Sequence, residues 1–277
     1  MPGQFPRATW RRVIPATALL LIAAIAALQP GAWAQSAEDF IPVTDEMLQN
    51  PAASDWLMWR RTLDSWGYSP LDQVDRENVG ELRMGGTRDL AIGTGEITPL
   101  AYNGVLYVPQ ASDVIQALDA VSGDLIWEYR RDIPEDLYEM VGGNARNNRN
   151  LAIFENLIIN TSDDNFVFAI DAVTGETLWM HRMDEGVRGD YAPRRSSGRG
   201  VAYWSGRPDE SDAQIFMITP GYHLVALDAA TGRPVPNFGQ DGVVDLKLGL
   251  DRPVDLIEAV IGSSSPPVVV GDVVIVG

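Results

Sequence analysis

The stretch ALDAVSG at residues 117–123 is followed four residues later by Trp127. The same pattern occurs twice more, as AIDAVTG at 169–175 with Trp179, and as ALDAATG at 226–232 with Pro236 at the tryptophan position. The aspartates of successive copies, at positions 119, 171 and 228, recur at intervals of roughly 50 residues. A pattern that recurs at this spacing is typical of a repeat architecture, in which each copy forms one structural unit beside the next.

Each copy of the pattern has the features of a β-hairpin. An apolar strand runs into the aspartate, whose side chain can cap a tight turn, and the glycine supplies the positive φ that such a turn needs. The tryptophan then lies on the returning strand. A further strand precedes each copy by about ten residues, and a fourth strand of this kind stands near the end of the sequence: residues 105–108, 157–159, 215–218 and 272–276.

Four strands in each repeat predict an all-β fold, a β-propeller of four-stranded blades. A two-sheet sandwich also contains many short strands, but it does not repeat a turn and a tryptophan at the length of a blade. In a propeller the tryptophan of one blade can dock against the next blade, which gives the repetition a structural reason. We therefore expect about four blades within residues 95–277, preceded by an N-terminal segment at residues 35–94 that leads into the propeller.

Residues 1–34 have the layout of a secretory signal peptide. Arg7, Arg11 and Arg12 precede an apolar run at residues 13–28, and a small-x-small cleavage sequence ends at Ala34. A membrane anchor is the alternative, but the apolar run is shorter than the ~20 residues that span a bilayer. We therefore expect cleavage after Ala34, export to a periplasm, and a mature protein without a stable membrane span.

The composition excludes several classes of function. Asp and Glu outnumber Lys and Arg by 38 to 21, a net charge of −17, so nucleic acid and anionic membrane surfaces would repel the protein. The sequence has no cysteine, which excludes disulfides, cysteine-ligated zinc, iron–sulfur clusters and a cysteine nucleophile.

A series of short motifs, in a fixed order, resembles the quinoprotein dehydrogenases that use pyrroloquinoline quinone (PQQ). The motifs are DW at 55–56, YSPL at 68–71, NVGEL at 78–82, EITPL at 96–100, NRNLA at 148–152, RGVAYW at 199–204 and SSPPV at 264–268. The resemblance implies an eight-bladed propeller with PQQ and a calcium or lanthanide ion on its axis. It also implies oxidation of an alcohol or an aldose sugar, with electrons passed to cytochrome c or a membrane quinone.

The resemblance further implies cofactor contacts for four residues. Glu96 matches a family glutamate that contacts the cofactor, and Ser264 matches a hydroxyl residue that hydrogen-bonds PQQ. Arg149 resembles the arginine of the methanol and ethanol branch, and Arg199 that of the glucose-oxidising branch; either guanidinium suits the carboxylates of PQQ. The ordinary alternatives are that Glu96 is a solvated loop acid and that Ser264 is a turn serine. Arg146, Arg194 and Arg195 are interpreted as surface arginines in a basic loop and are not nominated.

The spacing of these four residues favours a shared site. Successive members are separated by roughly 50–65 residues, each interval close to the length of one blade. Each also stands where the first strand of a blade should begin. Four successive blades are therefore expected to present one residue each to the same central funnel.

The family's catalytic aspartate and metal ligands would lie beyond Gly277, so no catalytic residue and no metal ligand is assigned in this chain. We expect the chain to be the N-terminal portion of a longer enzyme. Many alcohol dehydrogenases of the family also cap PQQ with a ring of adjacent cysteines, where this sequence has VGGN at 141–144. Two alternatives stay open: a non-catalytic propeller scaffold, which would need a lipidated cysteine that is absent, and an inactive fragment.

Overall fold

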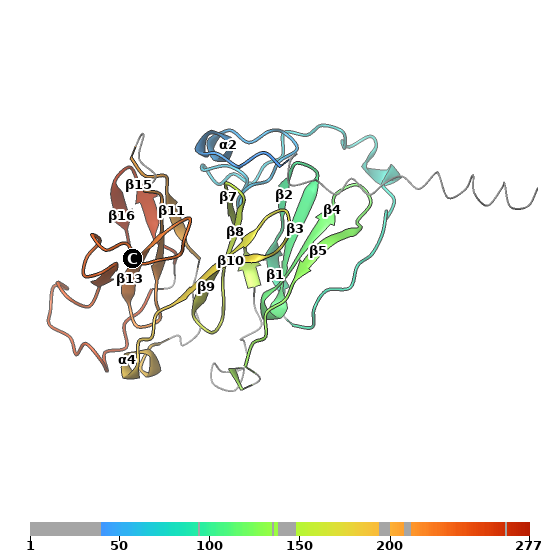
Figure 1. Cartoon of the computed structure of the whole chain (residues 1–277). Coiled ribbons are helices and arrows are strands. Elements are labelled where there is room, and N and C mark those ends of the chain that lie inside the picture. Colours follow the sequence, from blue (N-terminus) through green and yellow to red (C-terminus); the bar gives the residue numbers. More distant parts are fainter. Residues whose placement is uncertain are drawn as a thin grey trace, which may run out of the picture. The chain divides into compact units, whose positions relative to one another are not determined.

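The computed structural model describes residues 40–93, 95–134, 136–137, 148–193, 200–207, 212–263 and 265–277. These residues belong to one compact unit of short strands joined by turns, with a few helical turns between them (Figure 1). The signal peptide expected at residues 1–34 lies outside the described residues. The all-β prediction is confirmed.

In the part of the chain that the structure describes, three four-stranded antiparallel sheets form propeller blades, in which each strand lies beside the next one along the chain. Blade 1 consists of β2 (Leu100–Tyr102), β3 (Val105–Gln110), β4 (Val114–Asp119) and β5 (Leu125–Tyr129). Blade 2 consists of β7 (Ala152–Phe154), β8 (Leu157–Thr161), β9 (Phe166–Asp171) and β10 (Thr177–Arg182). Blade 3 consists of β11 (Ala202–Trp204), β12 (Gln214–Ile218), β13 (His223–Asp228) and β14 (Val243–Asp245).

Two smaller sheets accompany the blades. They are an antiparallel pair of β15 (Val268–Val270) with β16 (Val273–Ile275), and a parallel pair of β1 (Gly95–Thr98) with β6 (Asn148–Asn150). The helical turns are α2 (Asp45–Gln49), η1 (Val79–Glu81), η2 (Ala111–Asp113) and α4 (Val187–Asp190). Within the described ranges, no helix is long and apolar enough to cross a membrane.

The aspartate of each repeat caps a turn as the sequence predicted. In blade 1 the Oδ1 atom of Asp119 accepts hydrogen bonds from the backbone N–H groups of Val121 and Ser122, at 2.9 and 2.7 Å. The carboxylates of Asp171 and Asp228 cap the corresponding turns of blades 2 and 3. These local bonds fix the hairpin that returns the chain toward the outer strand.

The tryptophans of the repeat dock against the following blade. The Nε1 atom of Trp127 in blade 1 donates to the carbonyl of Ala172 in blade 2, at 3.2 Å, and its ring lies on Gly175. Trp179 in blade 2 donates in the same way to Ala229 in blade 3, at 3.1 Å. In blade 3, where the repeat has proline, the outer strand β14 begins only at residue 243.

Apolar side chains fill the space between successive sheets. The first cluster joins blades 1 and 2 and includes the fully buried rings of Tyr107 and Phe168. The second joins blades 2 and 3 around Trp179, and the third joins blade 3 to β15 and β16 through Phe216 and Val269. Because such a blade is covered on both faces, its middle strands are nearly continuous apolar runs rather than alternating ones.

The N-terminal segment is tied to blades 1 and 2 by two isolated antiparallel bridges. Val43 pairs with Glu155, and Trp56 pairs with Ala101. Further along the segment, large apolar side chains face solvent, among them Trp66, which is 79% exposed.

Each blade has two distinct ends. We call the end at which the first strand begins the leading end. In blade 1, Leu100 begins the first strand and pairs with Tyr107 of β3, the strand that η2 directly follows. At the opposite end, Asp119 of the repeated turn pairs with Val105. Blades 2 and 3 have the same arrangement. Since β1 and β6 directly precede the first strands of blades 1 and 2, both lie at the leading end.

Candidate functional site

The candidate residues Glu96 and Arg149 lie on neighbouring strands. Glu96 belongs to β1 and Arg149 to β6, and these strands pair in parallel with Gly95 opposite Asn148. Their backbones are therefore close together at the leading end, beside blades 1 and 2. Both side chains lie outside the described part of the structure, so their contact with a cofactor stays a prediction.

The other two candidates, Arg199 and Ser264, lie outside the described residues. Their chain neighbours come close together: a methyl group placed on Gly200 would lie 3.6 Å from Cβ of Pro266. β11 and β15 are also in contact. The described chain that follows each of these two candidates thus converges at the leading end of blade 3.

A buried ionic cluster connects blades 1 and 2 at this end. The guanidinium of Arg131 contacts the carboxylate of Asp164 with two nitrogens, at 2.5 and 2.9 Å, and that of Asp113 at 2.9 and 3.1 Å. Its Nη2 atom also donates to the hydroxyl of Ser162, at 2.5 Å. All three charged side chains are at most 12% exposed. Charge-assisted bonds of this kind hold a site rigid when the buried charges are matched.

The carboxyls of this cluster differ in acidity. Burial raises the pKa of Asp113. Burial also disfavours the charged form of Asp164, but the hydrogen bonds from Arg131 and Ser162 outweigh it and lower the pKa of Asp164. For the neighbouring half-buried Asp163, burial, and then the charges of Asp113 and Asp164, raise the pKa to about 7. The leading end of blade 2 therefore carries a carboxyl that ionises near neutral pH.

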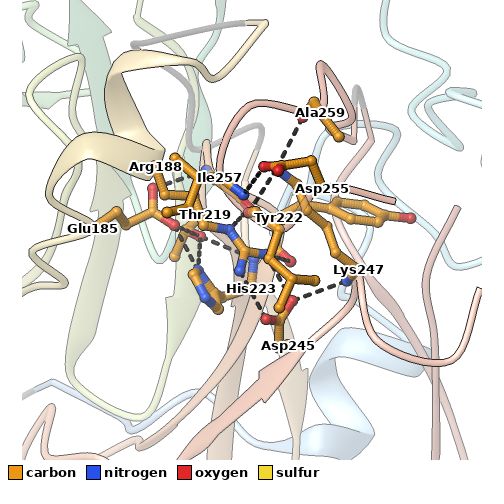
Figure 2. A network of polar contacts seen from close by, with 12 residues as sticks. Glu185, Arg188, Thr219, Tyr222, His223, Asp245, Lys247, Asp255, Ile257 and Ala259 are labelled. Carbon is orange, nitrogen blue, oxygen red and sulfur yellow. Dashed lines mark hydrogen bonds and ion pairs between the residues drawn. The ribbon is translucent and has the colours of Figure 1, made fainter. Parts of the chain in front are cut away.

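A second polar cluster occupies the leading end of blade 3 (Figure 2). The buried carboxylate of Glu185 accepts hydrogen bonds from the hydroxyl of Thr219, at 2.5 Å, and from the backbone N–H of Gly221, at 2.8 Å. Its Oε1 atom also lies 2.7 Å from Nδ1 of His223. Burial opposes ionisation of Glu185, but the hydrogen bonds with His223 and Thr219 prevail and lower its pKa.

Arg188 joins this cluster to the outer strand of blade 3. Its two terminal nitrogens contact the carboxylate of Asp245, at 2.6 and 2.7 Å, in the bidentate geometry that suits a guanidinium. Its Nε atom donates to the carbonyl of Gly221, at 2.7 Å. Figure 2 shows Arg188 between Glu185 and Asp245.

Ser162 and Thr219 occupy equivalent positions in their blades. Each directly follows the second strand, and its N–H donates to the carbonyl of the residue that opens the third strand, Phe166 at 2.8 Å and His223 at 2.9 Å. Each hydroxyl is bonded into a buried ionic cluster. Successive blades therefore repeat one arrangement at the leading end, a hydroxyl held by charged side chains.

Sequence reasoning did not find these two clusters. Arg131 follows the outer strand of blade 1, and its partners come from turns in two different blades, so no local motif connects them. Ser162 and Thr219 carry the one available signal, a hydroxyl residue at the same distance before the repeated Ala-x-Asp in both blades.

A polyanionic ligand at the leading end would need cationic partners. Arg131 and Arg188 are already engaged with carboxylates, so Arg149 and Arg199 stay the predicted partners for the carboxylates of PQQ. No group of three or more His, Asp or Glu side chains within the described ranges is arranged to hold a metal ion. A cavity of about 300 Å³ between blade 3 and β15–β16 lies beside Trp204 and Gln214, away from the leading end.

A sequence model of the β-propeller domain of glucose, ethanol and alcohol dehydrogenases, the PQQ family, matches residues 56–156 and 137–277. The chain belongs to this family. The resemblance that the motifs indicated is thereby confirmed, together with the propeller fold that it implied.

Curated relatives of this PQQ-family chain are alcohol dehydrogenases. The dehydrogenase subunit of the quinone alcohol dehydrogenase of Gluconobacter oxydans is 32% identical over 174 residues, which are 62% of this chain and 22% of that protein. Quinohemoprotein alcohol dehydrogenase ADH-IIG of Pseudomonas putida is 33% identical over 193 residues, 66% of this chain and 25% of that protein. The chain thus spans about a quarter of the length of these relatives.

Solved structures agree on the fold. A quinohemoprotein alcohol dehydrogenase of Pseudomonas putida HK5 superposes with a TM-score of 0.52 at 26% identity, over 70% of this chain and 28% of that one. A europium-containing methanol dehydrogenase superposes with a TM-score of 0.51 over 68% of this chain and 32% of that one; at 21% identity it shows the fold alone.

Proposed function

We propose that this chain is the N-terminal portion of a PQQ-dependent alcohol dehydrogenase whose cofactor binds at the leading end of the blades. The observation that carries the proposal is the family match, together with the parallel pairing of β1 and β6 that brings Glu96 and Arg149 onto adjacent strands. An alcohol is favoured over an aldose because the relatives from Gluconobacter oxydans and Pseudomonas putida are both named as alcohol dehydrogenases.

The chain's own residues would bind and orient the cofactor. Arg149 and Arg199 would pair with PQQ carboxylates, and Ser264 would donate a hydroxyl hydrogen bond. The clusters around Arg131 and Glu185 would hold the turns beside them, which limits motion of the site. PQQ, when bound, supplies the hydride acceptor for oxidation of the alcohol carbon.

The electron acceptor and the compartment belong to the same proposal. One relative is named a 1-butanol dehydrogenase (cytochrome c) and others are named quinone alcohol dehydrogenases, which supports a cytochrome c or a quinone as acceptor. The leader at residues 1–34 supports export to a periplasm. A calcium or lanthanide ion would accompany PQQ; within the described ranges no group of three or more His, Asp or Glu side chains is arranged to hold it.

The proposal is tested by titrating PQQ, in the presence of calcium, into the purified protein and its arginine variants. Arg149→Ala and Arg199→Ala should each weaken binding by about tenfold or more, because each removes a charge-assisted contact to a carboxylate. Arg130→Ala is the matched control, since the Arg130 side chain is 60% exposed, directly follows β5 and pairs with Glu128 of that strand. Unchanged affinity in either variant removes that arginine from the site.

A further inference from the structure

Lys247 is the one lysine in the whole sequence. Its side chain is buried, with 4% of the residue exposed. A lysine is rarely placed so deeply without a partner that compensates for the lost hydration. The position of this ammonium therefore calls for a specific role.

The ammonium of Lys247 bonds to one segment of the chain. Its Nζ atom donates to the backbone carbonyls of Leu256, at 3.2 Å, and Ala259, at 2.9 Å. Its backbone N–H donates to the carboxylate of Asp245, the residue that also binds Arg188. Figure 2 shows this chain of contacts, which runs from the blade 3 cluster through Asp245 to the segment around Asp255 and Ala259. Burial and the nearby Arg188 charge lower the pKa of Lys247, as is usual for a desolvated amine.

Residues 255–263, which we call the strap, have little else to hold them. The carboxylate of Asp255 caps a turn by accepting from the N–H groups of Ile257 and Glu258, at 2.8 and 2.6 Å. The apolar side chains of the strap contribute little burial, since Ile257 is 49% and Val260 is 71% exposed. A segment of this kind stays ordered mainly through its polar contacts.

The strap runs across the leading end of blade 3. A methyl group placed on Gly262 would lie 2.9 Å from Pro193 and 3.6 Å from the carbonyl of Pro220, so the backbone passes close to the turn between β12 and β13. At the end of the strap, the hydroxyl of Ser263 donates to the carbonyl of Ser265, at 3.0 Å, and the N–H of Ser265 donates back to that hydroxyl, at 3.2 Å.

We propose that Lys247 is a positioning residue, whose ammonium anchors the strap to blade 3 and thereby sets the hydrogen-bonded residues Ser263 and Ser265 for the approach of the cofactor. The role of these two residues in binding PQQ rests on the proposed function, whereas the anchoring does not. Lys247 itself touches no reacting group. It acts through the two carbonyls that it holds, and through Asp245, which ties it to Arg188.

The test compares Lys247→Met with Arg233→Met, a matched control that removes an exposed cation from the same blade. Hydrogen exchange is measured on the cofactor-free proteins, and PQQ is then titrated in the presence of calcium. Lys247→Met should speed exchange at residues 256–262 by about tenfold or more, because two hydrogen bonds from a charged donor are lost. The affinity for PQQ should fall by about tenfold, while exchange in blade 2 stays unchanged. The control should alter neither.

Asp255→Ala tests the proposal if Lys247→Met fails to fold. It removes the exposed carboxylate that caps the turn of the strap and leaves blade 3 intact. It should therefore speed hydrogen exchange in the strap and weaken PQQ binding as Lys247→Met does. Unchanged exchange in the strap of both variants would overturn the anchoring. Faster exchange with unchanged PQQ affinity would overturn the positioning role alone. A wild-type protein that exchanges slowly in the strap but binds no PQQ would overturn the proposed function, and the positioning role with it.

Discussion

Asp163 and Asp164 are adjacent residues of one type, and their surroundings shift their acidity in opposite directions. The guanidinium of Arg131 holds Asp164 ionised, whereas Asp163 is half-buried beside two other carboxyls. Burial and repulsion raise the pKa of Asp163 to about 7. A cofactor with several carboxylates bound nearby would repel the ionised form of Asp163 further. The charge of the leading end therefore changes with pH near neutrality.

Asp163→Asn should stabilise the protein at pH 8 and leave it unchanged near pH 4. The folded-state pKa of about 7 exceeds the ordinary value of 3.8, so between these values the folded protein keeps a proton that the unfolded chain releases. The free energy of unfolding therefore falls as pH rises through this window, and the asparagine variant escapes the loss. We expect a gain of about 1–2 kcal/mol at pH 8, below the full value of the shift because the side chain is partly exposed to solvent.

Asp164→Asn is the matched control and should have the opposite effect. It removes a partner of the buried Arg131 and should cost about 3 kcal/mol at pH 8. Urea unfolding of the three proteins at pH 4 and pH 8 measures both effects. A gain from Asp163→Asn that is equal at the two pH values would contradict the assignment.

At the scale of the element, the hairpin and the docked tryptophan are the features that the sequence predicted best. The Asp-capped turn depends on residues within one short stretch, so its pattern is visible without the fold. The parallel pair of β1 and β6 could not be predicted in the same way, because both strands are very short and come from different repeats. The strap was missed for a similar reason, since its anchor Lys247 reaches it only through tertiary structure.

Gly175→Ala should destabilise the protein much more than Gly123→Ala. Both glycines occupy the same turn of the repeat with nearly equal φ, +73° and +75°. A methyl group on Gly175 would lie 2.7 Å from the ring of Trp127, while one on Gly123 meets nothing within 4 Å. Gly123→Ala therefore carries only the cost of the left-handed backbone, about 1–2 kcal/mol, and Gly175→Ala adds displacement of the ring, for a total of about 3 kcal/mol or more.

Urea unfolding measures both glycine variants, and the wavelength of tryptophan emission reports the position of the Trp127 ring. Equal losses of stability in the two variants would mean that the tryptophan does not depend on close approach to the glycine.

At the scale of the whole molecule, propeller architecture and family could both be read from the repeat and from the order of the motifs. The individual motifs are short, but they occur in the family's order, and the family model matches residues 56–156 and 137–277. The site could be predicted only in outline. The motifs indicated which residues precede each blade, while the ionic clusters of Arg131 and Glu185 depend on side chains that meet only after the blades pack together.

Export is the prediction that concerns the chain as a whole. The mature protein should begin at Gln35, because the cleavage sequence ends at Ala34. N-terminal sequencing of the protein from a periplasmic fraction checks this, and Ala34→Arg should block cleavage as the control. Recovery of an intact N-terminus from the cytoplasm would contradict export.

Binding of PQQ at the leading end of the blades is the property on which the proposed activity depends. The most direct measurement is a titration of PQQ, with calcium present, into the complete gene product, followed by tryptophan fluorescence. We predict saturable binding of one PQQ per chain, weakened by about tenfold or more in Arg149→Ala and unchanged in Arg130→Ala. Failure of the wild-type protein to bind PQQ, or equal binding by all three proteins, would contradict the claim.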